Sequence, residues 1–255
     1  MSIPDVHIFP HATGAAATTV AKHQEPQDLI FYAGWFCPYV QRAWIALEEK
    51  GIPYQYKEVN PYKKEAHFLA INPKGLVPAV EYKGRALYES LVLCEFFEDA
   101  YPSTKSMFPA DPVDRAVARI WLDHISKTFM PAHHKLLQVQ DPAKQKEHLQ
   151  EMNEFLRKFA AAVKGPYFFG EEFGIVDLAI APWIIRDWVV QEHRGYSRAD
   201  VSPEWKTYAE NVEKRESVIN TTSLREHTLE IYGRYLRDEA QSAAARAIRE
   251  GRVIP

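Results

Sequence analysis

The chain has 255 residues, of which 46% are hydrophobic and 25% charged, and its formal net charge is −3. This composition can bury a core, and the length predicts one large domain or two smaller ones. Charges of both signs are interspersed, which argues against a nucleic-acid partner. The sequence contains no apolar run of about 18 residues, so we expect no membrane span. With only two cysteines and no signal-peptide pattern, we expect a cytoplasmic protein without a disulfide scaffold.

Residues 1–27 show no helical or strand period, so we expect them to form a flexible or loosely docked extension. From residue 28 the pattern reads β-α-β-α-β-β-α, which predicts a compact α/β domain over 28–101. An apolar run at 29–32 predicts the first strand, and Gly51 is a C-terminal cap for a helix over 38–50. The other expected elements are a strand at 54–59, a short helix before residue 70, a hairpin of 77–82 and 85–88 around Lys83-Gly84, and a helix at 90–101.

Three prolines in residues 102–112 predict a linker. Beyond it, apolar residues recur at helical spacing, so we expect an all-helical domain over 113–255. Its expected helices are 113–139, 144–163, 177–190, 203–214 and 224–249. The predicted architecture is therefore an α/β domain followed by an all-α domain.

The most informative residue is Cys37, which follows the first strand and directly precedes Pro38, a residue suited to a first helical turn. The free N–H groups and positive dipole end of that helix favour a thiolate, the form that attacks disulfides and electrophiles. The position three residues later is Val40, so the site cannot form an internal disulfide. A mixed disulfide on Cys37 must then be resolved by an external thiol, and glutathione is the abundant candidate.

The two cysteines also have structural interpretations. Cys37 could be a buried structural cysteine, which is the common fate of a lone cysteine. Cys94 lies in the apolar stretch 91–97, and we expect it to fill the core.

Two further motifs contain residues suited to binding a peptide or an anion. Pro78 begins a strand, where a cis Val77–Pro78 bond would leave the Val77 backbone available to a peptide-like ligand. Glu89-Ser90 stands where the next helix begins, so the Ser90 hydroxyl and exposed amides could hold an anion. The simpler interpretation of Ser90 is an ordinary helix cap.

Residues 36–42 (FCPYVQR), 72–78 (NPKGLVP) and 88–90 (YES) together resemble the glutathione-binding half of glutathione transferases. The Cys-Pro-Tyr-Val form is similar to the cysteine-type classes, namely omega with its lambda and dehydroascorbate-reductase relatives. The resemblance runs from Leu29 to the C-terminus. It implies a thioredoxin-like N-terminal domain followed by an all-helical C-terminal domain.

The resemblance also implies residue roles. Cys37 would form a mixed disulfide with glutathione, and Val77, beside cis Pro78, would pair with its cysteinyl unit. Glu89 and Ser90 would hold the γ-glutamyl group, and Tyr39 would flank the tripeptide. Lys64, or its neighbour Lys63, would meet the glycyl carboxylate.

The helical domain departs from the family pattern at one position. Members often carry Ser or Thr three residues before a buried Asp, whereas Gly174 precedes Asp177 here, at a cost of a few tenths of a kcal/mol. The co-substrate pocket is expected between the domains, although aromatic residues at helical spacing are more often core. Its candidate residues are Trp35, Phe36, Phe129, His133 and Trp183.

The predicted function is a glutathione-dependent thiol transferase or reductase. Its substrates would be glutathionylated thiols, dehydroascorbate-like oxidants or glutathionyl ketones, and glutathione would be a co-substrate with no permanently bound cofactor. The alternative is a non-catalytic carrier of glutathione or hydrophobic ligands with the same fold. The histidines form no metal-binding pattern, and the resemblance implies a homodimer.

Overall fold

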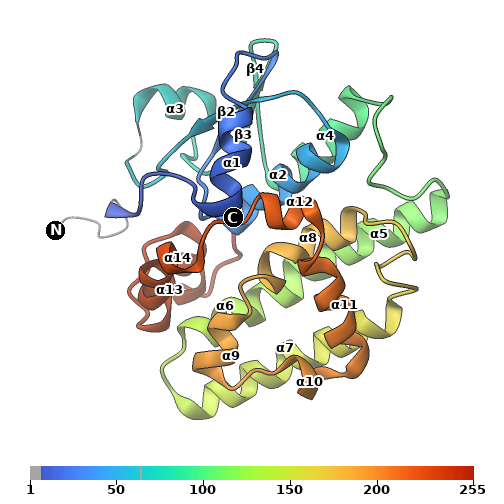
Figure 1. The fold of residues 1–255 in the computed structure, drawn as a ribbon. Coiled ribbons are helices and arrows are strands. Elements are labelled where there is room, and N and C mark those ends of the chain that lie inside the picture. Colours follow the sequence, from blue (N-terminus) through green and yellow to red (C-terminus); the bar gives the residue numbers. More distant parts are fainter. Residues whose placement is uncertain (1–6, 64) are drawn as a thin grey trace. The chain divides into compact units, whose positions relative to one another are not determined.

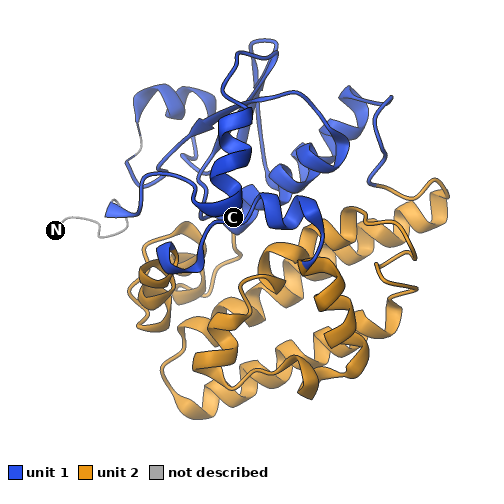
Figure 2. Cartoon of the chain, in the orientation of Figure 1, with its two compact units in different colours: residues 1–107, 214–227 blue, residues 108–213, 228–255 orange. Residues whose placement is uncertain are grey.

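The computed structural model describes residues 7–63 and 65–255. The chain forms two compact units, which Figure 2 shows in different colours. Unit 1 contains Met1–Met107 and Lys214–His227, and unit 2 contains Phe108–Glu213 and Thr228–Pro255. Residues 214–227, which the sequence analysis placed in the helical domain, therefore group with the first unit.

Unit 1 is built on a four-stranded mixed sheet in the order β2-β1-β3-β4 (Figure 1). Strand β1 is parallel to β2 and antiparallel to β3, which forms an antiparallel hairpin with β4. Consecutive residues Ala79 and Val80 of β3 are both fully buried, so both faces of the sheet are covered at this strand. The strands are β1 (Leu29–Ala33), β2 (Gln55–Glu58), β3 (Ala79–Tyr82) and β4 (Arg85–Tyr88).

Three helices complete the expected α/β domain. Helices α2 and α4 pack against each other, whereas α3 lies on the other side of the sheet (Figure 1). Helix α2 ends as predicted, because Gly51 adopts a left-handed conformation with φ of 60°. The bounds are α2 (Pro38–Lys50), α3 (Ala66–Ile71) and α4 (Ser90–Ala100). The predicted order of elements over 28–101 is confirmed.

The expectation of no regular structure before residue 28 was wrong, because helix α1 spans Gly14–Lys22. Its buried face consists of Ala16 and Thr19, which are too small and too polar to produce an apolar period. Thr19 Oγ1 donates a 2.7 Å hydrogen bond to the carbonyl of Asn220, at the end of helix α12 (Glu216–Asn220). A contact between residues distant in sequence thus stabilises α1. After α12 the chain forms a 3₁₀ turn, η3 (Arg225–His227).

Unit 2 is helical, as predicted, with differences at two prolines. The expected helix 113–139 contains a π turn, because Pro131 has no N–H to donate to the carbonyl of Lys127. The expected helix 177–190 contains Pro182 and divides after Ile184. The helices are α5 (Pro112–His124), η2 (Ile125–Phe129), α6 (Met130–Gln138), α7 (Pro142–Ala162), α8 (Ile175–Ile184), α9 (Trp188–Arg194), α10 (Arg198–Val201) and α11 (Pro203–Glu213).

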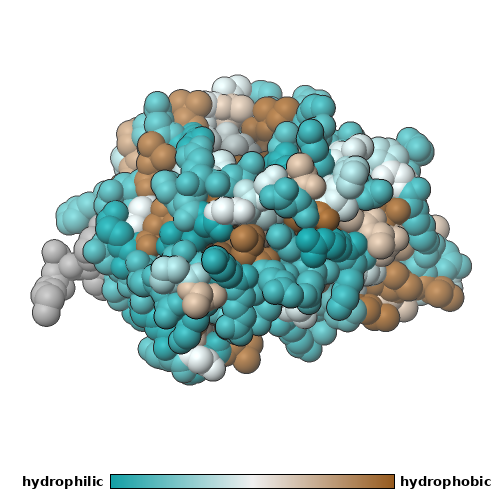
Figure 3. Space-filling model, turned by 90° about the horizontal axis from the view of Figure 1, so that it is seen from below, coloured by the Kyte–Doolittle hydropathy of each residue, from teal (hydrophilic) through white to brown (hydrophobic). Residues whose placement is uncertain are grey.

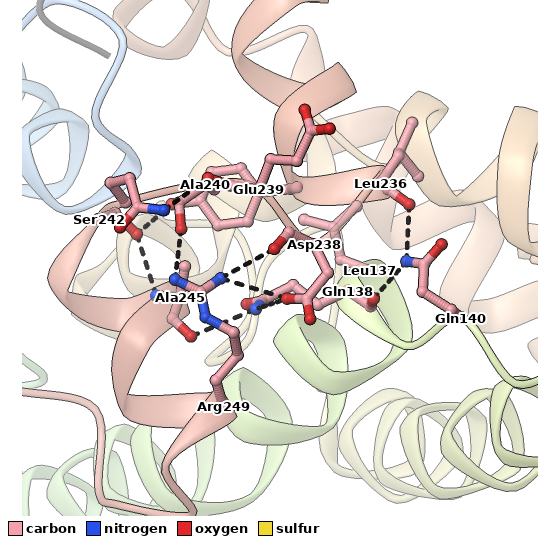
Figure 4. A network of polar contacts seen from close by, with 12 residues as sticks. Leu137, Gln138, Gln140, Leu236, Asp238, Glu239, Ala240, Ser242, Ala245 and Arg249 are labelled. Carbon is pink, nitrogen blue, oxygen red and sulfur yellow. Dashed lines mark hydrogen bonds and ion pairs between the residues drawn. The ribbon is translucent and has the colours of Figure 1, made fainter. Parts of the chain in front are cut away.

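The prediction of a single helix over 224–249 was wrong. The segment contains η3, α13 (Leu229–Leu236) and α14 (Ala243–Arg249), with Asp238 at a positive φ of 58° between the last two. Figure 4 shows what stabilises this turn: Gln138 Nε2 donates to Asp238 Oδ1 and to the Ala245 carbonyl, and Arg249 donates to the Ala240 carbonyl. Hydrogen bonds from side chains on α6 and α14 therefore stabilise a turn where the helical period of the sequence predicts a continuous helix.

The outer face of the chain shown in Figure 3 is mostly hydrophilic, and hydrophobic residues occur there in separate small groups. No helix of the described residues is long and apolar enough to cross a membrane.

Asp177 is the main buried polar anchor of unit 2. It is 1% exposed, and its carboxylate accepts hydrogen bonds from Gly174 N, Phe168 N and Tyr208 Oη at 2.7–2.8 Å. Burial raises the pKa of Asp177 to about 6, so the group is ionised at neutral pH, where it best accepts from these donors. The expected Gly174 cap and Asp177 at the third helical position are confirmed.

Replacing this carboxylate tests its structural role. Asp177→Ala leaves buried donors without an acceptor, so we expect it to lower the free energy of unfolding by about 3 kcal/mol at pH 7.5, measured by urea denaturation. Asp123→Ala is the matched control, because Asp123 forms an exposed ion pair with Lys127, and it should change stability by less than about 1 kcal/mol. Equal losses in the two variants would contradict this role.

Candidate active site

The sheet register brings the three sequence motifs to one end of unit 1. Tyr32 of β1 pairs with Ala79 of β3, and Ala79 pairs with Tyr88 of β4. The chain therefore leaves β1 toward Cys37, enters β3 after Pro78 and leaves β4 toward Glu89, all at the same end of the sheet. Residues that are 40 and more positions apart in sequence thus lie together.

Cys37 is the N-cap residue of α2, and Pro38 occupies the first turn, as predicted. The thiol is partly exposed, and its Sγ lies 3.9 Å from the carbonyl oxygen of Val77. Cys37 N donates to the Gly34 carbonyl at 2.9 Å and closes the turn that presents the thiol. A helix N-terminus beside a partly exposed sulfur is an environment that favours the reactive thiolate.

The Val77–Pro78 peptide bond is cis, as predicted. Val77 precedes β3, so its backbone lies outside the ladder that pairs β3 with its neighbours. The preceding turn is fixed by buried Asn72, which donates to the Leu76 carbonyl and accepts from Lys74 N. The Val77 backbone is thereby positioned beside the Cys37 sulfur.

Glu89 and Ser90 begin helix α4 at the same end of the sheet. Glu89 has a positive φ of 79°, an uncommon conformation for a residue with a side chain and one found at constrained sites. Its exposed carboxylate accepts a 2.7 Å hydrogen bond from Lys74 Nζ, and Ser90 is buried at the first turn of α4. This arrangement combines a carboxylate for an amine with a helix N-terminus for an anion.

Arg42 was not predicted as part of the site. Its side chain is 2% exposed and lies over the Tyr39 ring at 5.7 Å. Burial lowers the pKa of Arg42 to about 10, against the attraction of Tyr39 and of both cysteines, so it remains a cation at neutral pH. A buried cation one helical turn beyond Cys37 favours negative charge on the sulfur.

Cys94 is fully buried in α4, which supports its predicted role in the core. Burial raises its pKa to about 12, although Arg42 acts in the opposite direction. Cys94 is therefore a neutral thiol under physiological conditions.

Two residues outside the predicted site hold the turn before Cys37. Glu58, the last residue of β2, accepts from Trp35 N at 3.0 Å, and the Phe9 carbonyl accepts from Trp35 Nε1 at 2.8 Å. Trp35 is 2% exposed. A main-chain carbonyl has no sequence signature, so Phe9 could not have been found from the sequence.

The other predicted residues fall in three groups. Lys64 lies outside the described residues, whereas Lys63 is exposed. Phe36 belongs to unit 1, where its ring stacks on Tyr62. Phe129, His133 and Trp183 belong to unit 2 and line one cavity inside it.

His133 is 5% exposed, and neither ring nitrogen has a hydrogen-bond partner among the described residues. Burial, and secondarily its neighbour His134, lowers the pKa of His133 to about 3. The ring is therefore neutral at physiological pH. Within 7–63 and 65–255, no cluster of three or more His, Cys, Asp or Glu residues could hold a metal ion.

Two family models match this chain, one in its N-terminal part and one in its C-terminal part. The family model described as glutathione S-transferase, N-terminal domain, matches residues 36–100, and the C-terminal domain model of the same family matches residues 120–211. Glutathione S-transferase omega-1 of Sus scrofa is 33% identical over 166 residues, which cover 63% of this chain and 68% of that protein.

Two solved structures extend the comparison. Glutathione transferase Omega 3C from Trametes versicolor is 60% identical, has a TM-score of 0.86, and covers 91% of this chain and 100% of its own. Rice GST1, solved in complex with glutathione, is 27% identical with a TM-score of 0.76 and covers 84% of this chain and 100% of its own. These matches show that the chain belongs to the glutathione S-transferase family, of which it is an omega-like member.

Proposed function

We propose that this protein is a glutathione-dependent thiol transferase that acts through a Cys37–glutathione mixed disulfide. The observation that carries the proposal is the position of Cys37: a partly exposed thiol at the N-terminus of α2, 3.9 Å from the Val77 carbonyl. Candidate substrates are glutathionylated thiols, dehydroascorbate-like oxidants and glutathionyl ketones.

The surrounding residues support glutathione as the ligand. The Val77 backbone would pair with the cysteinyl unit and bring the glutathione sulfur to Cys37. The Glu89 carboxylate would bind the γ-glutamyl amine, and Ser90 with the N-terminus of α4 would bind its carboxylate. Tyr39, held under Arg42, would flank the tripeptide.

Reduction of a glutathionylated thiol would proceed in two exchange steps. The Cys37 thiolate attacks the glutathione sulfur of the substrate disulfide, and the substrate thiolate leaves and takes a proton from water. A second glutathione thiolate then attacks the same sulfur of the Cys37 mixed disulfide, which releases oxidised glutathione and regenerates the Cys37 thiolate. Conjugation of glutathione to an electrophile is disfavoured, because it needs a hydroxyl where Cys37 stands.

The first test removes the nucleophile while preserving the site. Cys37→Ser should reduce the transfer rate from a glutathionylated peptide to the uncatalysed rate, since a hydroxyl cannot form the mixed disulfide. Glutathione binding, measured by calorimetry, should persist because the other contacts remain. Cys94→Ala is the matched control and should retain transfer. Near-native transfer by Cys37→Ser would refute the mechanism. A wild-type protein that does not bind glutathione would refute the proposed glutathione site.

Homodimer formation and a cytoplasmic location are further parts of the proposal. Val113 and Ile120, seven positions apart on α5, are 68% and 52% exposed and form an apolar stripe on one helical face. We expect multi-angle light scattering to give twice the chain mass, and Ile120→Glu to shift the protein toward monomer. A monomeric wild type at micromolar concentration would exclude stable pairing.

A further inference from the structure

Trp35 is held at both its backbone and its side chain, in the turn that ends at Cys37. Its N–H donates to Glu58 Oε1 at 3.0 Å, and its indole Nε1–H donates to the carbonyl of Phe9 at 2.8 Å. Its ring also meets Phe36 edge-on at 5.7 Å. The turn of residues 34–37 is thus fixed by β2 on one side and by residues 7–13, here called the N-terminal strap, on the other.

The N-terminal strap is itself bound to residues 214–227, here called the clamp segment. Thr13 N donates to Ser223 Oγ at 3.1 Å, and Leu224 N donates to Thr13 Oγ1 at 3.0 Å. The Phe9 ring lies 4.1 Å from the His227 ring. Two hydrogen bonds at Thr13 and a ring contact at Phe9 therefore hold the strap against the clamp segment.

The clamp segment in turn forms hydrogen bonds with helix α2, which begins after Cys37. Gln41, 1% exposed, donates from Nε2 to Thr221 and to Thr222 Oγ1 at 3.0–3.2 Å. At the other end of α2, Glu49 accepts a bidentate pair from Arg215 at 2.6–2.7 Å. The strap, the clamp segment, α2 and the turn before Cys37 therefore form one closed circuit of contacts.

The surrounding residues limit how this turn could relax. A side chain at Gly34 would meet the Val59 carbonyl at 3.1 Å, so the turn is packed closely against the end of β2. Gln41 N donates to the Cys37 carbonyl at 3.1 Å, which joins the turn to the first turn of α2. The turn has little room to relax, so a shift of Trp35 would be passed on to Cys37, the residue that ends the turn and caps α2.

From this circuit we infer that the N-terminal strap is a positioning element for the nucleophile and acts through Trp35. By holding the indole, the strap keeps the Cys37 sulfur aligned with the N-terminal N–H groups of α2, which favour its thiolate. Trp35 is thereby a positioning residue. The inference rests on the proposed role of Cys37 as the nucleophile.

A double-mutant cycle tests the pathway. Phe9→Ala removes the ring contact with His227 and loosens the strap, and Trp35→Phe removes the indole N–H but keeps a ring. Each should lower the rate of Cys37 alkylation by iodoacetamide at pH 7 about fivefold, the equivalent of one net hydrogen bond. Each should also move the midpoint of the pH–rate profile upward, which loss of global stability alone does not do. The double variant should be no slower than Trp35→Phe alone.

Val92→Ala is the matched control, since Val92 is 58% exposed on α4 and should leave rate and profile unchanged. Additive losses, unchanged rates, or an equal change in Val92→Ala would overturn the inference. If Trp35→Phe fails to fold, Thr13→Val, which removes the bond from Leu224 N, replaces it and must slow alkylation in the same direction. Iodoacetamide needs no glutathione site, so a wild type without a glutathione adduct would refute the proposed function and leave this test intact.

Discussion

The start of helix α2 directly after Cys37 is the constraint on which the candidate site depends. Pro38 fixes the first turn, and Cys37 is the N-cap residue at the end where any helix presents free N–H groups. The same helix carries Arg42, a buried cation, and Gln41, which ties it to the clamp segment. The electrostatics that favour the thiolate and the contacts that hold it in place therefore come from one element.

The sheet explains why the remaining site residues lie beside that helix. Because β1 is antiparallel to β3 and β3 to β4, the motifs at Cys37, Val77–Pro78 and Glu89–Ser90 emerge at one end of the sheet. Each has an unusual local feature there: a capping cysteine, a cis proline and a glutamate with positive φ. Unit 2 depends in a comparable way on Asp177, which satisfies donors from three separate parts of its own unit.

The sequence predicted the elements and motifs that rest on local chemistry. Pro38 and Gly51 bound α2 as expected, and Lys83-Gly84 forms the expected hairpin turn. It failed where distant contacts decide the conformation. Helix α1 depends on Thr19 reaching Asn220, and the C-terminal segment turns at Asp238 because Gln138 and Arg249 bind there. The Phe9 carbonyl at Trp35 was equally invisible, since every residue has such a group.

The most direct test of the central claim is the intact mass of the protein after incubation with oxidised glutathione, with Cys37→Ser in parallel. The account predicts a single glutathione adduct on wild type, none on the variant, and removal of the adduct by reduced glutathione. Cys94 should not react, because burial keeps it protonated. An unmodified wild type, or an adduct that persists in Cys37→Ser, would contradict the claim that Cys37 exchanges disulfides with glutathione.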